Sequence, residues 1–275
     1  MRDFLRMRAV PGVEHVEKDA YQRTVRSGKR TGWIRISPGR ARGSFTLEMS
    51  PSLGAVQSTV VARVRRMFDL DADPARIVAR LSEDPRLARF VELRPGLRVP
   101  RAFDVAELAA RAILGQQVTV AAARTLAGRL ARAFGDPIET PFASLDRLWP
   151  TPRQIASSTH ASLVAIPLTR ARASALAHLM SAIADRRISL RFAEAHTPAA
   201  DIERTLAKLV ELPGIGPWTA NYIAMRALAW SDAFPEGDLV LRKALGGATP
   251  RACRVESERW RPFRAYAVLH LWMNA

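Results

Sequence analysis

The sequence contains a single cysteine, Cys253, among its 275 residues. One thiol cannot supply an internal disulfide framework, a thiolate zinc site or a four-cysteine iron–sulfur cluster. The histidines also lack metal-ligand spacing, because no two of them lie at i, i+4. They are His15, His160, His178, His196 and His270. We therefore expect no transition-metal site.

A signal peptide and long hydrophobic runs are missing as well. The first ten residues, MRDFLRMRAV, carry charge throughout and have no apolar core of the kind that signal peptides require. The best candidate for a membrane span, 222–230, is short and is interrupted by Arg226. The expected location is the cytoplasm, in association with the nucleoid.

Acidic residues are scarce relative to basic ones. Lysine plus arginine number 42 and aspartate plus glutamate 26, which gives a net charge of +16. Most of the basic residues are arginines, which favour bidentate contacts with phosphate. Such an excess is typical of nucleic-acid-binding proteins. Charge alone is also compatible with a basic ribosome- or membrane-associated protein, or with the arginine-rich composition of a high-GC genome.

The first seventy residues predict a small antiparallel sheet followed by a helix. Apolar and polar residues alternate over 45–49, the period of a half-buried strand. Weaker strand patterns cover 20–26 and 33–37, and the turn-like segment 27–32 lies between them. Apolar residues then recur at helical spacing over 56–67.

After Asp73 and Pro74 the pattern is helical. Asp104, with Glu107 three residues later, resembles a capping box at the start of a helix that Gly115 breaks. Further helices are expected at 118–134, 152–158, 160–165, 169–185 and 199–211. The sequence thus predicts a mainly α protein with a small N-terminal α/β domain over 1–72 and a helical domain over 73–275.

The segment Leu-Pro-Gly-Ile-Gly-Pro at 212–217 joins two predicted helices, so that a hairpin of helices spans about 202–230. Glycines at 214 and 216 permit positive φ and a close approach of another backbone. The first N–H groups of the second helix have no intrahelical partner and can face an anion such as a DNA phosphate. An ordinary pair of packed helices gives the same pattern.

Four segments besides 212–222 carry a family likeness, which extends over most of the chain in order: 94–100, 111–118, 234–238 and 259–272. The chain resembles the 3-methyladenine DNA glycosylase II branch of the helix–hairpin–helix DNA glycosylase superfamily. The resemblance implies an N-terminal domain similar to the TATA-binding-protein fold, followed by two helical lobes with the active site between them. It also implies a monofunctional enzyme that flips alkylated bases, such as 3-methyladenine and 7-methylguanine, out of duplex DNA and hydrolyses the N-glycosyl bond.

Asp238 is the expected catalytic residue. Breaking an N-glycosidic bond builds positive charge on the deoxyribose, which a fixed carboxylate stabilises while orienting or deprotonating the attacking water. Asp238 also precedes a predicted helix, so the competing interpretation is an ordinary N-cap; one residue can serve both purposes. A cationic leaving base, as in an N3- or N7-alkylated purine, needs no general acid.

The resemblance places an electron-rich pocket at Trp218, Tyr222 and Trp272, with Phe4 as a weaker member. A cationic base over an indole face gains about 0.5–2 kcal/mol. Core packing is the alternative for each aromatic. We assign Trp149, Trp230 and Trp260 to the core.

Other roles follow from the resemblance alone. Strand-cutting relatives carry lysine where Trp218 stands, so no lyase step is expected. Gln117 occupies the position of the side chain that fills the gap left by a flipped base; its alternative is an exposed loop glutamine. DNA contacts are expected at Gly214, Ile215, Gly216, Trp218 and Thr219. The backbone carbonyls of Val210, Leu212 and Ile215 would hold a monovalent cation, Na⁺ or K⁺, and no other cofactor is expected. The expected state is a monomer on double-stranded DNA.

Three other functions compete with this one. The first is a DNA-binding protein without catalysis, and the second is a glycosylase for deaminated purines or uracil. Neutral bases of the second kind need protonation or tight hydrogen bonding, for which the sequence offers no obvious acid. The third is a bifunctional glycosylase–lyase.

Overall fold

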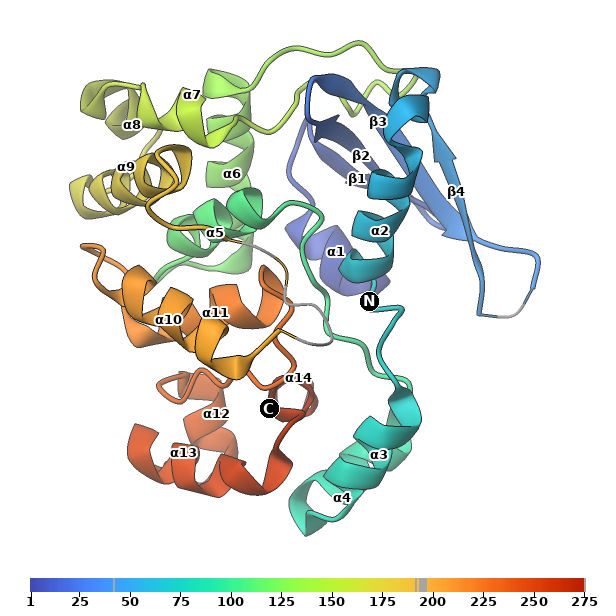
Figure 1. The fold of residues 1–275 in the computed structure, drawn as a ribbon, viewed down its shortest axis with the longest axis vertical. Helices are drawn as coiled ribbons and strands as arrows, with labels where there is room; N and C mark the ends of the chain where they lie inside the picture. Colours follow the sequence, from blue (N-terminus) through green and yellow to red (C-terminus); the bar gives the residue numbers. More distant parts are fainter. Residues whose placement is uncertain (42, 191, 193–196, 275) are drawn as a thin grey trace. The chain divides into compact units, whose positions relative to one another are not determined.

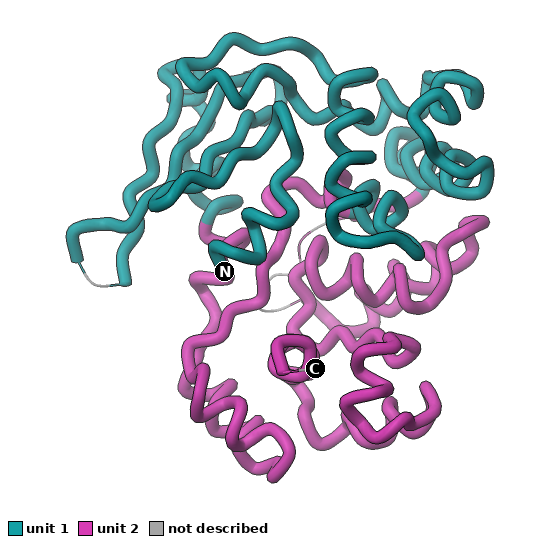
Figure 2. The backbone as a smooth tube through the Cα atoms, turned by 180° about the vertical axis from the view of Figure 1, so that it is seen from behind, with its two compact units in different colours: residues 1–64, 109–187 teal, residues 65–108, 188–275 magenta. Residues whose placement is uncertain are grey.

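The computed structural model describes residues 1–41, 43–190, 192 and 197–274. His196 therefore lies outside the described residues. The described chain forms one four-stranded antiparallel sheet and a succession of helices (Figure 1). It divides into two compact units, 1–64 with 109–187 and 65–108 with 188–275 (Figure 2). Each unit combines two separate stretches of chain. The two predicted domains, 1–72 and 73–275, are instead continuous in sequence, and this division stays a prediction.

The sheet of the first unit has the order β1-β2-β3-β4, with every neighbouring pair antiparallel. Its strands are β1 (Glu14–Val16), β2 (Tyr21–Ser27), β3 (Arg30–Pro38) and β4 (Phe45–Met49). The three predicted strands are confirmed, and β1 is an addition. The turn between β2 and β3 contains Gly28 at φ 60°, a conformation that suits glycine.

Helices complete the first unit. They are α1 (Arg2–Arg8), η1 (Pro51–Val56), the greater part of α2 (Gln57–Met67), the end of α5 (Val105–Leu114), α6 (Val120–Phe134), α7 (Pro152–Ala156), α8 (His160–Ala165) and α9 (Arg170–Ala184). In Figure 1, α2 lies across the sheet, and Arg63 on this helix donates to the carbonyl of Arg26 in β2 at 3.1 Å. The predicted helices from 105 to 185 are confirmed, with α6 starting at Val120 because Thr119 is its N-cap.

A buried carboxylate ties the start of the chain to α5. Glu14 accepts from the Tyr21 hydroxyl at 2.5 Å and from Arg111 at 2.8 Å, and Arg23 lies 3.7 Å away. Burial alone would raise the pKa of Glu14, but the guanidinium groups of Arg111 and Arg23 lower it below its usual value. Arg111 also donates to the carbonyl of Arg8, which fixes the last turn of α5.

The second unit is helical. Its helices are the end of α2, α3 (Pro74–Ser82), α4 (Pro85–Leu93), the start of α5, α10 (Ala199–Val210), α11 (Pro217–Arg226), α12 (Leu239–Ala244), α13 (Pro250–Ser257), η2 (Glu258–Trp260) and α14 (Arg264–Trp272). Asp104 accepts from the Glu107 N–H at 2.9 Å, so the capping side of the predicted box is confirmed.

The prediction that the second helix of the hairpin reaches Trp230 is wrong, because α11 ends at Arg226. Leu228 donates to the carbonyl of Ile223, and Ala229 takes φ 64°, so the chain turns away from the helix axis. Arg101 donates to the Ala229 carbonyl and supports this turn.

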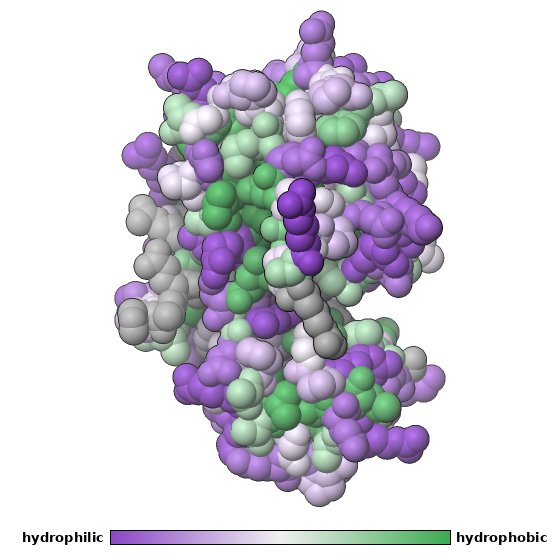
Figure 3. All heavy atoms as spheres, turned by 90° about the vertical axis from the view of Figure 1, so that its right-hand side faces the viewer, coloured by the Kyte–Doolittle hydropathy of each residue, from purple (hydrophilic) through white to green (hydrophobic). Residues whose placement is uncertain are grey.

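The described residues contain no helix that is both long and apolar enough to cross a membrane. On the face in Figure 3, hydrophilic side chains predominate and hydrophobic ones lie in smaller areas between them.

Candidate active site around Asp238

Asp238 ends a segment without regular secondary structure that runs from the end of α11 and begins helix α12. Its Oδ1 accepts from the Leu241 N–H at 3.0 Å, and its own N–H donates to the Pro235 carbonyl at 2.8 Å. Asp238 is therefore an N-cap, as one of the two interpretations expected. The cap accounts for only one of the contacts of its carboxylate.

The indoles of two tryptophans make the other contacts with the Asp238 carboxylate. The Trp218 Nε1 donates to Oδ2 of Asp238 at 2.9 Å, and the Trp272 Nε1 donates to Oδ1 at 3.0 Å. Both oxygens are thus held by N–H donors, which suits an ionised carboxylate because that group only accepts. Asp238 is 9% exposed. Since little water screens it, its attraction for a nearby positive charge is stronger than at the surface.

The three tryptophan and tyrosine residues predicted for the pocket lie together beside this carboxylate. The rings of Trp218 and Tyr222 are stacked, with centroids 5.3 Å apart and planes at 15°. The Trp272 ring is 6.5 Å from that of Tyr222. All three side chains are half-buried. The group therefore combines partly accessible, electron-rich rings with a fixed negative charge, a combination that attracts a cation.

Arg226 belongs to this group, although in the sequence it stands out only as a break in an apolar run. Its Nη1 donates to the Tyr222 hydroxyl at 2.6 Å, and its Nε donates to the Pro100 carbonyl at 2.7 Å. Arg226 follows Tyr222 by four residues in α11, a spacing that puts the two side chains on one helix face. That spacing is the signal from which the contact could have been predicted.

Helix α14, which carries Trp272, is buried from Arg264 to Leu271. The Tyr266 hydroxyl donates to buried Asp69 at 2.7 Å, and burial raises the pKa of Tyr266. Two residues before Trp272, His270 is also buried. Burial and the nearby charge of Arg94 lower the pKa of His270 to about 4. The hydrogen bond of His270 to the Phe90 backbone acts in the opposite direction but is the smaller effect. These contacts hold α14, the helix that ends at Trp272, against its neighbours.

The hairpin between α10 and α11 has one left-handed glycine. Gly214 takes φ 84°, as predicted, but Gly216 takes φ −88° as the N-cap of α11, so positive φ does not explain Gly216. A Cβ at Gly216 would have no neighbour within 4 Å, so the surface there is open to another molecule. Ile215 and Thr219 are each 3% exposed, so the predicted DNA contacts at these two residues stay a prediction.

The donor set predicted for a monovalent cation is chemically suitable. Val210 is the last residue of α10, so its carbonyl is one of the four that lack an intrahelical donor. The Leu212 carbonyl accepts from the Ile215 N–H at 3.1 Å and keeps a second lone pair. Among the described residues no cluster of histidine, cysteine, aspartate and glutamate could hold a metal ion. The cation stays a prediction.

Phe4 and Gln117 belong to the first unit. Phe4 is half-buried in α1, and the guanidinium of Arg8 lies 3.8 Å from its ring centroid. Gln117 is exposed in the turn between α5 and α6 and takes φ 53°. A positive φ is uncommon for a residue other than glycine and often marks a functional position. Of the core assignments, Trp260 is fully buried, whereas Trp149 and Trp230 are half-buried.

Known proteins resemble the chain over nearly its whole length. Residues 1–104 match the family model "AlkA N-terminal domain". The chain is 35% identical over 272 residues to DNA-3-methyladenine glycosylase 2 of Escherichia coli K12, with 99% of this chain and 92% of that protein covered. It is 42% identical over 268 residues to the probable bifunctional transcriptional activator/DNA repair enzyme AlkA of Mycobacterium tuberculosis H37Rv. That match covers 96% of this chain but only 52% of the mycobacterial protein, so the chain spans about half of its length.

Solved structures agree on the fold. The 3-methyladenine DNA glycosylase of Archaeoglobus fulgidus superposes with a TM-score of 0.77 at 20% sequence identity, covering 99% of this chain and 92% of that one. The likeness in fold accordingly extends over nearly the whole chain. The protein belongs to the AlkA-type 3-methyladenine DNA glycosylase II family of the helix–hairpin–helix superfamily.

Proposed function

We propose that this protein is a monofunctional DNA glycosylase that excises alkylated bases, 3-methyladenine and 7-methylguanine among them, from duplex DNA and leaves an abasic site. The observation that carries the proposal is the Asp238 carboxylate, held by the indoles of Trp218 and Trp272. The name of the E. coli relative, DNA-3-methyladenine glycosylase 2, supports the same reaction. We further propose that the protein acts as a monomer in the cytoplasm.

The geometry suggests a mechanism. An alkylated purine carries positive charge, and the stacked faces of Trp218 and Tyr222 favour a cation over its neutral parent by about 0.5–2 kcal/mol. As the bond to the sugar lengthens, positive charge moves onto the deoxyribose. The carboxylate of Asp238 stabilises that charge without having to reorient, because both of its oxygens are already fixed.

The remaining site residues take the roles that the family resemblance assigns. The backbone of Gly214 to Thr219, on the open surface at Gly216, binds DNA phosphate. Gln117 fills the gap that the flipped base leaves, and Phe4 contributes an aromatic face. Carbonyls of Val210, Leu212 and Ile215 would hold Na⁺ or K⁺, which would supply positive charge for binding a phosphate.

The test is to incubate the protein with methylated duplex DNA and to identify the products. We expect free 3-methyladenine and 7-methylguanine, with the strand intact until alkali is added. Borohydride trapping of the protein on DNA would instead indicate a lyase, as in the bifunctional alternative. Release of hypoxanthine or uracil without release of alkylated bases would contradict the proposed substrate class.

A further inference from the structure

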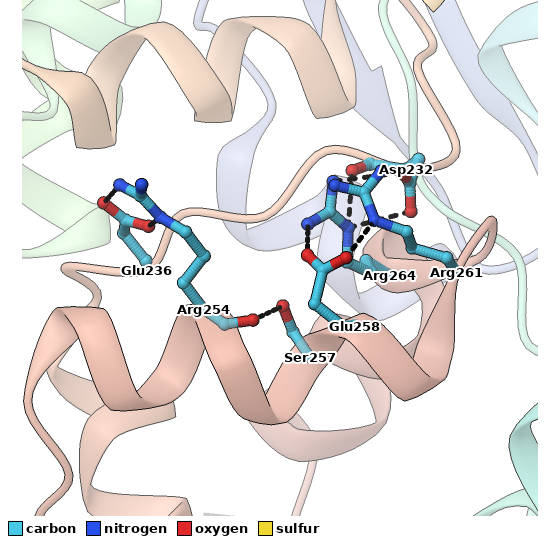
Figure 4. Close-up of polar contacts among 7 residues, drawn as sticks. All are labelled: Asp232, Glu236, Arg254, Ser257, Glu258, Arg261 and Arg264. Carbon is cyan, nitrogen blue, oxygen red and sulfur yellow. Dashed lines mark hydrogen bonds and ion pairs between the residues drawn. The ribbon is translucent and has the colours of Figure 1, made fainter.

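Asp238 depends for its position on a segment that has no secondary structure of its own. Between the end of α11 at Arg226 and the start of α12 at Leu239, the chain makes only turns and bends. A carboxylate that must keep both oxygens in place needs such a segment to be fixed from outside. The structure shows two sets of ionic contacts that do this (Figure 4).

The first set fixes the segment at Asp232. This carboxylate is buried, and Arg264 donates to it with Nε at 2.8 Å and Nη2 at 2.9 Å. Arg261 also donates to Asp232, and Glu258 bridges Arg261 and Arg264 at 2.7 and 3.2 Å. Arg264 is the first residue of α14, the helix whose last residue is Trp272. Helix α14 therefore contacts the segment at both ends, through Arg264 on Asp232 and Trp272 on Asp238.

The second set fixes the segment two residues before Asp238. The guanidinium of Arg254, on α13, donates through Nε and Nη2 to the two carboxylate oxygens of Glu236 (Figure 4). The backbone between the two acidic residues is a tight turn, in which Asp238 donates to the Pro235 carbonyl at 2.8 Å. A shift of Glu236 would thus be transmitted to Asp238 through very few rotatable bonds.

This pair is partly exposed to solvent. The Arg254 side chain is 64% exposed and that of Glu236 20%. Exposed ion pairs contribute little to stability. A two-pronged contact does, however, restrict orientation more than a single one. The contact of Arg254 is with the turn that precedes Asp238.

We propose that Arg254 is a positioning residue for Asp238, acting through its two-pronged contact with Glu236. The inference rests on the proposed function, in which Asp238 stabilises the charge on the sugar. It predicts that loss of the Arg254 guanidinium loosens the hydrogen bonds from Trp218 and Trp272 to Asp238 and slows base release, while the fold and DNA affinity persist.

The test compares the full-length wild-type protein with Arg254→Met, Arg254→Lys and the charge swap Glu236→Arg with Arg254→Glu. The matched control is Arg251→Met, because Arg251 is an exposed residue of the same helix and has no ion pair among the described residues. Two readouts are taken. One is the single-turnover rate of 7-methylguanine release at saturating enzyme, and the other is hydrogen exchange at the tryptophan indoles by NMR. Trp260 is an internal reference, since its indole donates to Asp84 at 2.6 Å in a fully buried site.

We expect Arg254→Met to release base about fivefold more slowly, with DNA affinity unchanged. The indole protons of Trp218 and Trp272 should exchange faster, and that of Trp260 should not. The charge swap should restore much of the rate, Arg254→Lys should fall between, and Arg251→Met should match the wild type.

Unchanged rate and exchange in Arg254→Met would overturn the proposal. So would an equal change at Trp260, which would make Arg254 a residue of general stability. If the wild type releases no alkylated base, the proposed function fails on that assay alone, while indole exchange still decides whether Arg254 holds Asp238.

Discussion

The indole nitrogen of Trp272 lies 3.0 Å from Oδ1 of Asp238, although 34 residues separate them in the sequence. Trp218 makes the corresponding contact with the other oxygen, at 2.9 Å. In the proposed reaction these tryptophans have two functions: their faces attract a cationic base, and their N–H groups hold the carboxylate. Substitutions that keep an aromatic ring but remove its polar group can test the two functions separately.

Trp272→Phe keeps an aromatic face and removes the N–H donor. Because Oδ1 would lose the indole N–H and keep the Leu241 N–H, we expect the single-turnover rate of 7-methylguanine release to fall roughly tenfold, with DNA affinity little changed. Trp149→Phe, the same substitution in the other compact unit, should leave the rate unchanged. A wild-type rate for Trp272→Phe would show that the N–H contact has no part in the reaction.

Tyr222→Phe removes a hydroxyl and keeps the stacked ring. Buried Arg226 would lose the hydrogen bond from its Nη1 to the Tyr222 hydroxyl, so the free energy of unfolding in urea should fall by about 1–3 kcal/mol. Release of alkylated base should stay within about twofold of wild type, because the ring face is retained. The reverse pattern, normal stability with lost activity, would mean that the hydroxyl acts in the chemistry.

Gly216→Ala tests the DNA contact at the hairpin. The φ of −88° suits alanine and nothing lies within 4 Å of the added Cβ, so stability should change by less than about 1 kcal/mol. If DNA backbone approaches this surface, duplex affinity should fall about tenfold by fluorescence anisotropy. Gly96→Ala also adds a methyl group to open space and serves as the control. Equal affinities for both variants would place DNA elsewhere.

His270 makes stability depend on pH. Its pKa is about 4 in the folded protein, against an ordinary value of 6.5, so the unfolded chain binds the proton more readily. Stability from this group is complete above pH 6.5 and is lost as the pH falls toward 4. Between pH 7.5 and 5 the loss is about 2 kcal/mol.

The measurement is urea unfolding at both pH values for wild type and His270→Gln. The variant lacks this titration, so its stability should depend less steeply on pH, and the shared carboxylates cancel in the comparison. Equal pH dependence in the two proteins would show that His270 does not resist protonation.

The sequence predicts much of this architecture where local signals are strong. Alternation over 45–49 marks β4, and helical periodicity marks the helices from α5 to α10. The short strand β1 was missed because three residues give too little periodicity. The early end of α11 was missed because the turn at Ala229 depends on Arg101, which is distant in the sequence.

The site shows the same division. Asp238 and the aromatic residues were predicted from a family resemblance, and the N-cap role from the helix that follows. The contacts between them depend on tertiary structure, which brings α11, α12 and α14 together. The pairing of Glu236 with Arg254 joins residues 18 apart through no local pattern, so sequence alone could not indicate it.

The most direct test of the account compares Asp238→Asn with Asp73→Asn. Both aspartates are helix N-caps, since Asp73 accepts from the N–H groups of Ala75 and Arg76, but only Asp238 contacts the indoles. The single-turnover rate of 3-methyladenine and 7-methylguanine release from methylated duplex DNA is measured for each. We expect the rate to fall by about 10²–10³-fold for Asp238→Asn with DNA binding retained, and to stay at the wild-type value for Asp73→Asn. Equal rates for the wild type and Asp238→Asn would contradict the account and leave Asp238 as a helix cap alone.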